Sequence, residues 1–460
     1  MISYPDRSDV IQRVYDHGQE HVFTFWEQLP DVKKKALLDD VASIDFDLLS
    51  RLYLQARESK PTAMGFEPAP YIPAPSGNKD LRRFDAAREE GIALIRKGVV
   101  AAFVVAGGQG SRLGFGGPKG LFGVGPVSGK SLFQIHAEKI LKSSIKYGAP
   151  IPWLIMTSQA NHEDTVRYLT ANRHFGLDEK DVYIFPQSMI PSLDTGGKLI
   201  LESPSAIFKN PDGHGGSLDA LADSGTLAAM RKRGIGIISY FQVDNPLISI
   251  IDPVFIGFHA QRGADISSKG LMKAYPGEKI GVFVRFDDGT IGVVEYSDLP
   301  ERLQNMRDGS GALRFCMGSI AIHLFCVGFL EKITGGSAVS LPFHVARKKI
   351  TPCTPSGPAE IEGFKFEKFV FDALPLTDKN IVLETIREDE FAPIKNPSGV
   401  DSVESAHELM TGLYRRWLGE RGILIPSLVK KLEISPLLAL EAADIPDSLS
   451  IPDAESVYLE

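Results

Sequence analysis

Hydrophobic residues recur at different spacings along the chain, and each spacing predicts a different kind of element. Between Val10 and Leu52 they return every three or four positions, which predicts a helical N-terminal region. The stretch from Lys60 to Asn78 contains five prolines and cannot form a regular helix or a central strand, so we expect an extended surface connector. Residues Asp80–Lys97 return to helical spacing and predict an amphipathic helix.

Beyond residue 98, apolar runs alternate with helical patterns. The valine-rich run Val99–Ala106 is typical of a strand that is covered on both faces of a parallel sheet. Further strands are predicted at Ile151–Thr157, Asp181–Phe185 and Ile235–Val243, and helices at His162–Asn172 and Ser217–Ala222. This alternation predicts an α/β fold with a doubly wound sheet. The turn Asp287-Asp288-Gly289 predicts a hairpin, so we expect the sheet to be mixed.

The later part of the chain predicts a second change of organisation. Residues Phe364–Asp372 alternate between apolar and polar and predict a strand, whereas Arg387–Asn396 is a charged run that we interpret as a solvated loop. Helical patterning from Ser405 leads into a small C-terminal lobe. We therefore predict a helical domain with its connector at residues 1–78, a central domain at 79–385 and a C-terminal domain at 386–460.

Composition limits the classes of partner. The formal net charge is −8, which argues against a nucleic-acid partner, because binding to a phosphate backbone requires clustered Lys and Arg. The three cysteines form neither a disulfide framework nor a zinc-binding spacing. The N-terminus lacks a signal-peptide pattern, and the longest apolar stretch, near Ile320–Leu330, is too short to cross a bilayer. We expect a cytoplasmic protein without a membrane partner.

A glycine-rich loop follows the first predicted buried strand. Its glycines expose the backbone and allow positive φ where N–H groups turn toward an anion, while Arg112 and Lys119 add positive charge. The loop glycines are Gly107, Gly108, Gly110, Gly114, Gly116 and Gly117. A cationic loop of this kind at the carboxyl edge of an α/β sheet predicts a polyphosphate site.

Two common phosphate motifs do not fit this loop. A P-loop ending is present at Gly129-Lys130-Ser131, but Val124 stands where the first glycine is required. A dinucleotide fingerprint fails because Gly114 comes one residue too late after Gly108 and Gly110. The loop therefore indicates neither kinase-type nor dehydrogenase-type binding.

Polar residues follow the later strands at the same predicted edge. Asp244 comes directly after Ile235–Val243, where its carboxylate would either hold Mg²⁺ beside substrate phosphates or cap the strand in an Asx-turn. Gln187 follows the Asp181–Phe185 strand, and an amide there either pairs with a pyrimidine or is simply solvated. The turn at residues 211–216, PDGHGG, predicts close backbone approach before a helix.

The loop sequence VAGGQGSRLG, followed by Pro118-Lys119-Gly120, resembles the signature of the UTP-dependent sugar-1-phosphate uridylyltransferases. Ser111 replaces the family threonine and keeps its hydroxyl. Within that family the chain resembles the eukaryotic-type UDP-N-acetylglucosamine pyrophosphorylases, from about His21 to Leu437. The resemblance implies a Rossmann-like nucleotide-diphospho-sugar transferase fold, UTP and a sugar 1-phosphate as substrates, and Mg²⁺ or Mn²⁺ as the metal.

The resemblance also implies roles for individual residues. Asp244 would bind the metal, Gln187 would contact uracil, and Lys395 would bind the phosphate of the sugar. The implied nucleotide-binding residues are Ala106, Gly107, Gly108, Gln187, Gly213 and Asp244, and the implied sugar-binding residues are His214, Gly281, Glu295, Ser319, Phe369 and Phe371. In the resembled family the C-terminal region closes over the site and can mediate self-association. We expect a monomer or a weak homo-oligomer.

Two residues depart from the family pattern at presumed sugar contacts. His214 and Ser319 both replace asparagine, and a histidine in the PDG turn is similar to enzymes that use glucose 1-phosphate. Phe369 and Phe371 instead match the aromatic wall of an N-acetyl pocket. N-acetylglucosamine 1-phosphate is the predicted acceptor, and UDP-glucose or broad UDP-sugar synthesis is the alternative. A nucleotide-sugar-binding regulator without turnover is the alternative from another class.

Charge dictates the expected mechanism. The phosphate of the sugar attacks the α-phosphorus of UTP, and repulsion between two anions is the main obstacle. We expect Mg²⁺ on Asp244 to bridge phosphate oxygens, Lys119 to stabilise the transferred group, Arg112 to hold pyrophosphate and Lys395 to hold the acceptor. No nucleophile from the protein is required.

Overall fold

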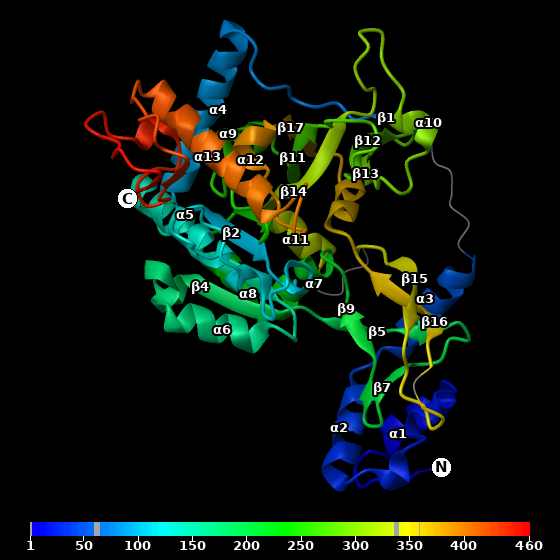
Figure 1. Ribbon diagram of the computed structural model, residues 1–460. Helices are drawn as coiled ribbons and strands as arrows, with labels where there is room; N and C mark the ends of the chain where they lie inside the picture. Colours follow the sequence, from blue (N-terminus) through cyan, green and yellow to red (C-terminus); the bar gives the residue numbers. More distant parts are fainter. Residues whose placement is uncertain (1, 59–64, 335–339, 358) are drawn as a thin grey trace. The chain divides into compact units, whose positions relative to one another are not determined.

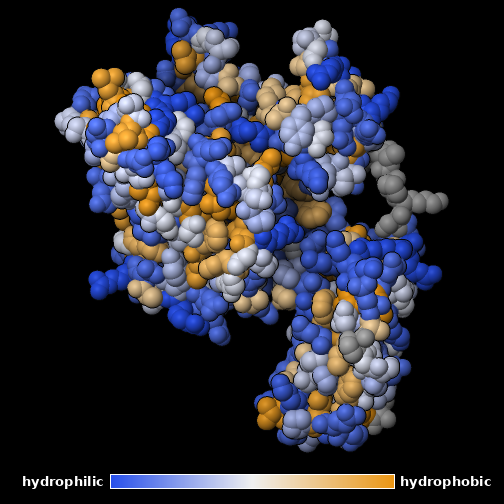
Figure 2. All heavy atoms as spheres, in the orientation of Figure 1, coloured by the Kyte–Doolittle hydropathy of each residue, from blue (hydrophilic) through white to orange (hydrophobic). Residues whose placement is uncertain are grey.

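The computed structural model describes residues 2–58, 65–334, 340–357 and 359–460. These residues form two compact units, and three separate stretches of chain contribute to each. The smaller unit is built from Met1–Ala63, Gln187–Gly216 and Leu341–Val370, and the larger unit from Met64–Pro186, Ser217–Ser340 and Phe371–Glu460. Hydrophilic side chains cover most of the face of each unit seen in Figure 2, with apolar residues in scattered groups.

A mixed sheet forms the centre of the larger unit (Figure 1). Its main path runs β1-β12-β14-β10-β2-β3-β4, with β11 beside β14, β17 beside β11 and β13 beside β12. The bounds are β1 Phe66–Pro68, β2 Val100–Val105, β3 Trp153–Thr157, β4 Val182–Pro186, β10 Ile237–Gln242, β11 Ile266–Met272, β12 Val282–Phe286, β13 Ile291–Val294, β14 Met317–Cys326 and β17 Asn380–Glu384. Strands β10, β2, β3 and β4 are mutually parallel, whereas β14 is antiparallel to β10. The predicted doubly wound mixed sheet is confirmed.

Helices cover both faces of this sheet. The helices of the larger unit are α4 Asn78–Arg96, α5 Leu132–Tyr147, α6 His162–Ala171, α7 Gly216–Asp223, α8 Thr226–Lys232, α9 Pro253–Gln261, α10 Glu301–Gln304, α11 Val327–Ile333, α12 Arg387–Glu390 and α13 Val403–Glu420. Ala102 and Val104 of β2 belong to one buried cluster with α4, α5 and α9. Phe103 points the other way and packs against Phe185 and Tyr240. All six residues of β2 are buried, as its apolar run predicts.

The C-terminal lobe lies within the larger unit. Strands β18 (Lys431–Ile434) and β19 (Ser456–Leu459) pair in parallel, and α13 packs on β18. Glu433 of β18 is 1% exposed, and its carboxylate accepts hydrogen bonds of 2.7 Å from the Val127 N–H and from both the N–H and the hydroxyl of Ser128. The C-terminal lobe is therefore hydrogen-bonded to the segment that connects the glycine loop to α5.

The smaller unit joins the N-terminal helices to strands from two distant stretches. The helices are α1 Ser8–Asp16, α2 Asp31–Ala42 and α3 Phe46–Glu58, and the strands are β5 Met189–Pro191, β6 Leu193–Asp194, β7 Leu201–Ser203, β8 Ala206–Ile207, β9 Lys209–Pro211, β15 His344–Ile350 and β16 Ile361–Glu367. One buried cluster contains Val14, Leu37, Leu193 and Phe366. The predicted N-terminal helices are confirmed, and their apolar faces pack against a sheet that no local pattern near them predicts.

Most local predictions agree with the structure. The predicted helices Asp80–Lys97 and His162–Asn172 are α4 and α6, and the turn at Asp287-Asp288-Gly289 joins β12 to β13. Part of the proline-rich connector, residues 60–64, lies outside the described residues. In the described part, Phe66–Pro68 forms strand β1 at the edge of the sheet, where a proline is tolerated.

Two predictions near the C-terminus are wrong. The strand predicted at Phe364–Asp372 ends at Glu367, and Val370–Leu376 forms a 3-10 helix, η7. The predicted solvated loop at Arg387–Asn396 contains α12, and the side chains of Glu390, Phe391 and Ile394 are buried. Charge in the sequence suggested solvent exposure there, but Glu390 is neutralised inside the protein by Lys269.

Candidate active site

The glycine loop folds back on itself at the end of β2. The Gly110 N–H donates to the Gly117 carbonyl at 2.9 Å, and the Lys119 N–H donates to the Gly108 carbonyl at 3.0 Å. The fold needs its glycines for different reasons. Of the predicted loop glycines only Gly114 uses the positive φ that glycine allows. A Cβ atom on Gly110 would lie 2.8 Å from Cδ1 of Phe115. Any side chain at position 110 would therefore clash with the Phe115 ring.

Three other loop glycines border open space. A Cβ atom on Gly108, Gly114 or Gly116 would meet no atom within 4 Å. Ala106 is fully buried, its N–H donates to Met156 and its carbonyl accepts from Asn161. The backbone that a ligand can approach thus begins at Gly107, which is half-buried, and continues through exposed Gly108.

Lys119 and Asp244 meet at the carboxyl edge of the sheet. Strands β2 and β10 are parallel with Val105 opposite Gln242, so the loops that follow them leave the same edge. The Lys119 Nζ lies 2.8 Å from Oδ2 of Asp244, and the two side chains keep 15% and 18% of their surface exposed. Arg112 lies in the one-turn helix η3 (Ser111–Leu113), is exposed, and makes no side-chain hydrogen bond or ion pair with any described residue.

Lys395 belongs to the same edge through the backbone of its neighbour. The Ile394 N–H donates to the Asp244 carbonyl at 3.0 Å. The Lys395 Nζ is exposed, 3.9 Å from Oδ2 of Asp401 and 5.8 Å from the centre of the Phe391 ring. Burial raises the pKa of Asp401 despite the nearby Lys395 charge. The structure therefore brings together three predicted residues, Lys119, Asp244 and Lys395.

The donor set at this edge fits a divalent metal that is shared with a substrate. No group of three His, Cys, Asp or Glu side chains with metal-binding geometry occurs among the described residues. Asp244 supplies one accessible carboxylate, a hard oxygen ligand of the kind that Mg²⁺ prefers. Mg²⁺ commonly binds through one or two carboxylates and substrate phosphates, so a single aspartate beside a polyphosphate loop is compatible with it.

Three predicted sugar-binding residues gather elsewhere in the larger unit. The Ser319 N–H donates to the Gly281 carbonyl at 2.8 Å, and a Cβ atom on Gly281 would lie 3.1 Å from Oε1 of Glu295. Ser319 lies where the pairing of β11 with β14 shifts register, and Ala321 in this irregularity has a φ of 55°. Such bulges redirect side chains and are common beside active sites. Phe371, which lies in η7 of the same unit, is buried.

The smaller unit holds the PDG turn and Gln187 together. Gln187 is buried, and its amide nitrogen donates to Oδ1 of Asp212 at 2.6 Å and to the Gly213 carbonyl. The Lys368 N–H donates to the Asp212 carbonyl at 2.7 Å. Gly213 has a φ of 87°, and a Cβ there would lie 2.3 Å from the Lys368 carbonyl oxygen. The turn is therefore seated against the end of β16 and tolerates only glycine at that position.

His214 and Phe369 stack within the smaller unit. Their ring centres are 5.4 Å apart at 27°, and the Val370 N–H donates to Nδ1 of His214 at 3.1 Å. That bond leaves the His214 Nε2 as the nitrogen that carries a proton in the neutral ring. The ring of His344 contacts Phe369 from 4.5 Å. Sequence reasoning missed His344, because it comes close to Phe369 only through the pairing of β15 with β16.

Other polar residues that support the site were also missed. Asn161 is fully buried, and its amide bonds the Ala106 carbonyl at 3.0 Å and the Ser158 N–H at 2.8 Å, which ties together the chain ends that follow β2 and β3. Asn245 is buried beside Asp244 and bonds to the backbone of Glu390 and Ala392. A signal for Asn245 existed in its position next to Asp244 at a strand end, but nothing in the local pattern marks Asn161.

A parallel-centred α/β sheet with a cationic glycine loop and an accessible aspartate at its carboxyl edge defines a nucleotide-binding protein of the doubly wound class. The chain belongs to the UTP–glucose-1-phosphate uridylyltransferase family, whose model matches residues 57–442. The family resemblance seen in the glycine loop is confirmed.

Relatives and solved structures agree with this assignment. The chain is 35% identical over 453 residues to UDP-N-acetylglucosamine diphosphorylase 2 of Arabidopsis thaliana, with 93% of this chain and 89% of the relative covered. It is 35% identical over 459 residues to diphosphorylase 1 of the same organism, with 95% and 90% covered. The crystal structure of the uridine diphosphate N-acetylglucosamine pyrophosphorylase from Trypanosoma brucei matches with a TM-score of 0.80 and 29% identity, covering 96% and 95% of the two chains.

None of the helices in the described part of the chain has the length and apolar character needed to span a membrane.

Proposed function

We propose that this protein transfers a uridylyl group from UTP to a sugar 1-phosphate, which yields a UDP-sugar and pyrophosphate. Membership in the uridylyltransferase family supports this reaction. The single observation that carries it is the juxtaposition of Lys119, Asp244 and Lys395 beside an open glycine loop. Two cations and a metal-binding carboxylate at one sheet edge are what a reaction between two phosphate anions requires.

Each charged residue has a separate task in the proposed reaction. Lys119 stabilises charge at the transferred phosphorus, Arg112 holds the leaving pyrophosphate, and Lys395 fixes the phosphate of the acceptor. The exposed Nζ of Lys395 and the exposed guanidinium of Arg112 can reach a ligand without first breaking a buried ion pair. Positioning and neutralisation supply most of the acceleration in phosphoryl-type transfer.

Mg²⁺, or Mn²⁺ in its place, is the proposed metal, and Asp244 would hold it. When bound, the ion neutralises phosphate oxygens and withdraws electrons from the reacting phosphorus. Lys119 is already hydrogen-bonded to the Asp244 carboxylate, so this pair orients the aspartate side chain before substrates arrive.

N-acetylglucosamine 1-phosphate is the proposed acceptor. The Arabidopsis relatives and the Trypanosoma structure carry that sugar in their names. Phe369 and Phe371 supply apolar surface of the kind that an acetyl group needs. The second candidate is UDP-glucose or broad UDP-sugar synthesis, which His214 and Ser319 favour, because both replace the family asparagine at proposed sugar contacts.

Further properties belong to the same proposal. We place the protein in the cytoplasm, because its three cysteines are free thiols and disulfides are rare in that compartment. The net charge of −8 argues against a nucleic-acid partner, whereas a nucleotide substrate needs only a local cationic pocket. A monomer or weak homo-oligomer is expected, which sedimentation analysis of the purified protein can measure.

The deciding experiment measures pyrophosphate release with UTP and Mg²⁺ across four acceptors: the 1-phosphates of N-acetylglucosamine, N-acetylgalactosamine, glucose and galactose. Preference for N-acetylated sugars supports the first candidate, and preference for glucose supports the second. If calorimetry shows that UTP binds but none of the four acceptors leads to pyrophosphate release, the protein is a nucleotide-binding regulator and the enzyme proposal is wrong.

A further inference from the structure

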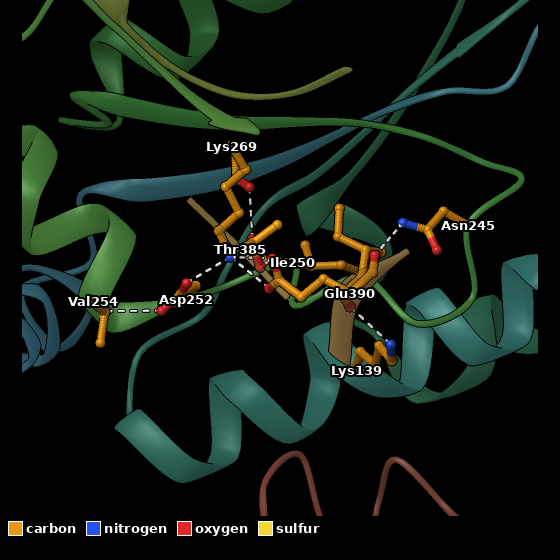
Figure 3. Close-up of polar contacts among 10 residues, drawn as sticks. Lys139, Asn245, Ile250, Asp252, Val254, Lys269, Thr385 and Glu390 are labelled. Carbon is orange, nitrogen blue, oxygen red and sulfur yellow. Dashed lines mark hydrogen bonds and ion pairs between the residues drawn. The ribbon is translucent and has the colours of Figure 1, made fainter. Parts of the chain in front are cut away.

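A fully buried lysine lies behind the candidate active site. Lys269 of β11 is 2% exposed, and its Nζ lies 2.6 Å from Oδ2 of Asp252 and 2.6 Å from Oε2 of Glu390 (Figure 3). Asp252 caps the N-terminus of α9, and Glu390 ends α12. The ammonium group therefore connects strand β11 to the helix that precedes it, α9, and to α12, which is more than a hundred positions away in sequence.

Glu390 extends this cluster toward the catalytic edge. Its carboxylate also accepts a hydrogen bond of 2.9 Å from the Thr385 hydroxyl. Its backbone carbonyl accepts from the Asn245 side chain at 2.6 Å (Figure 3). The Oδ1 of Asn245 accepts from the Ala392 N–H at 3.0 Å. The Asn245 side chain thus bonds to the backbone of the residues before and after Phe391. Asn245 itself follows Asp244 directly in the chain.

The chain after Ala392 leads directly to Lys395. Two residues beyond Ala392, the Ile394 N–H bonds the Asp244 carbonyl at 3.0 Å. The loop that carries Asp244 and the segment that carries Lys395 are therefore joined by three hydrogen bonds. The first of these bonds is made to the backbone of Glu390, the residue whose side chain Lys269 holds.

A second, half-buried lysine holds the following part of the Asp244 loop. The Lys139 Nζ on α5 donates to the Pro246 carbonyl at 2.6 Å and to the Ile248 carbonyl at 2.8 Å. Asp252 then closes the loop by bonding both the Val254 N–H and Lys269. Lys139 and Lys269 thus hold the loop between residues 244 and 252 at Pro246, Ile248 and Asp252.

Stability alone is a poor explanation for this arrangement. Removing charges from water is costly, and replacing a buried ion pair by well-packed apolar residues of similar volume often leaves a protein as stable or more stable. Two carboxylates share one ammonium group here, which adds to that cost. Buried ionic clusters do, however, specify a single geometry, because only one arrangement satisfies all of their hydrogen bonds.

We propose that Lys269 is a positioning residue for the transfer reaction, which holds Asp244 and Lys395 in register through Glu390 and Asn245. The inference rests on the proposed function for its kinetic consequence, but the structural consequence is independent of it. Loss of the Lys269 charge frees the Glu390 carboxylate, loosens the Asn245 contacts and lets the two catalytic segments move apart.

The test compares three variants of the full-length protein. Lys269→Met removes the charge and keeps the chain length, Lys269→Arg keeps the charge, and Glu390→Gln keeps the shape while weakening the pair. Arg233→Met is the matched control, because it breaks an ion pair with Asp181, whose side chain is 8% exposed like that of Glu390. Asp181 and Arg233 precede β4 and β10, at the opposite end of the strands from Asp244.

Kinetics give the first readout. We expect Lys269→Met to lower kcat about 100-fold, because a displacement near 1 Å is enough to cost that factor, and to raise the Mg²⁺ concentration for half-maximal rate. Lys269→Arg should recover most of the rate, and Glu390→Gln should lose about 10-fold. The control should keep the wild-type kcat and Mg²⁺ dependence. If Lys269→Met stays within twofold of wild type per folded molecule, or if the control loses as much, the proposal is wrong.

Hydrogen–deuterium exchange gives the second readout and needs no turnover. In Lys269→Met, exchange should rise in residues 244–248 and 390–396 and stay unchanged around residues 181–186. Glu390→Gln should show the same pattern more weakly and covers the case in which Lys269→Met fails to fold. Unchanged exchange in both segments overturns the proposal. A wild-type protein without turnover would instead refute the proposed function, while the exchange result would still decide the role of Lys269.

Discussion

The Nζ of Lys119 lies 2.8 Å from Oδ2 of Asp244, although 125 positions separate the two residues in sequence. One comes from the glycine loop after β2 and the other follows β10, and the parallel pairing of these strands brings them together. Their contact joins the predicted phosphate-binding loop to the predicted metal-binding residue. Substitution of Lys119 should therefore lower the catalytic rate while it changes the stability of the fold little.

Lys119→Met should lower kcat by about 10²–10³, because one lost stabilising charge in a transfer site costs roughly 3–4 kcal/mol in the transition state. The side chain is partly exposed, so the melting temperature should change little. Pyrophosphate release and thermal melts measure the two effects. Lys180→Met, which breaks the exposed pair with Asp178, is the control and should leave both unchanged. Near-full turnover of Lys119→Met would contradict the role assigned to it.

The fold could be predicted as far as its patterns are local. The apolar runs of β2, β3 and β10 identify buried strands, because a strand covered on both faces has no polar positions. The composition of the smaller unit could not be predicted in this way. Its sheet places Leu193 opposite Phe364, and no property of either segment alone encodes a pairing across such a separation.

The residues of the candidate site also fall into two groups, those that a local pattern identifies and those that only the folded chain brings together. Lys119 and Asp244 belong to compact motifs at strand ends, which a single window of sequence contains. Lys269 and Glu390 lie 121 positions apart, and each has the composition of a surface residue until the other neutralises it. The error at Arg387–Asn396 has this origin, since charge predicts exposure only when its partner is unknown.

His214→Asn should shift the sugar preference. The Val370 N–H donates to Nδ1 of His214, and an asparagine oxygen can accept that bond while leaving the space of the imidazole ring free beside Phe369. We expect the ratio of kcat/KM for N-acetylglucosamine 1-phosphate over glucose 1-phosphate to rise about 10-fold, which is typical for a change of pocket shape.

His174→Asn is the matched control for that experiment. His174 lies in the 3-10 helix η5 (Arg173–Gly176) with a φ of 50°, a conformation that asparagine accepts readily, so this variant should fold and keep the wild-type ratio. A ratio that stays constant in His214→Asn would show that His214 does not set the sugar preference. The same ratio measured for Ser319→Asn tests the other departure from the family pattern.

Glu433→Ala should loosen the connection between the C-terminal lobe and the chain after the glycine loop. It removes the acceptor for three hydrogen bonds and leaves the Val127 and Ser128 N–H groups without it. We expect a loss of roughly 3 kcal/mol in the free energy of unfolding, as for other lost bonds to buried charges. Urea titration measures it, and hydrogen exchange should rise in residues 124–130.

Glu455→Ala separates the effect of the buried contact from that of charge. Glu455 is also in the C-terminal lobe, but its side chain is 61% exposed and pairs with Lys430. Its removal should change the urea midpoint little, because exposed ion pairs contribute about 0–1 kcal/mol. Equal losses in the two variants would mean that Glu433 does not anchor the loop.

Acid should destabilise the protein partly through His136, which is fully buried under the candidate active site. Its Nε2 lies 2.9 Å from the Val243 carbonyl, the residue before Asp244, and Nδ1 has no hydrogen-bond partner among the described residues. Burial lowers the pKa of His136 to about 3, and the nearby Lys139 charge acts in the same direction, while Val243 and Asp244 oppose it. A charged ring would bury a second N–H without an acceptor.

The sign of the effect follows from proton binding. Between pH 6.5 and about 3, the unfolded chain binds a proton at His136 and the folded protein does not, so the free energy of unfolding falls as the pH falls through this window. His136→Gln keeps a donor for the Val243 carbonyl but cannot titrate. Its unfolding free energy should therefore depend less on pH, by at most roughly 1.4 kcal/mol per pH unit near pH 5. Urea titrations of both proteins from pH 4.5 to 7.5 measure the difference. His259→Gln should give a similar flattening, because burial lowers the pKa of His259 to about 4. Parallel curves for wild type and His136→Gln would mean that the folded protein accommodates a charged ring at this position.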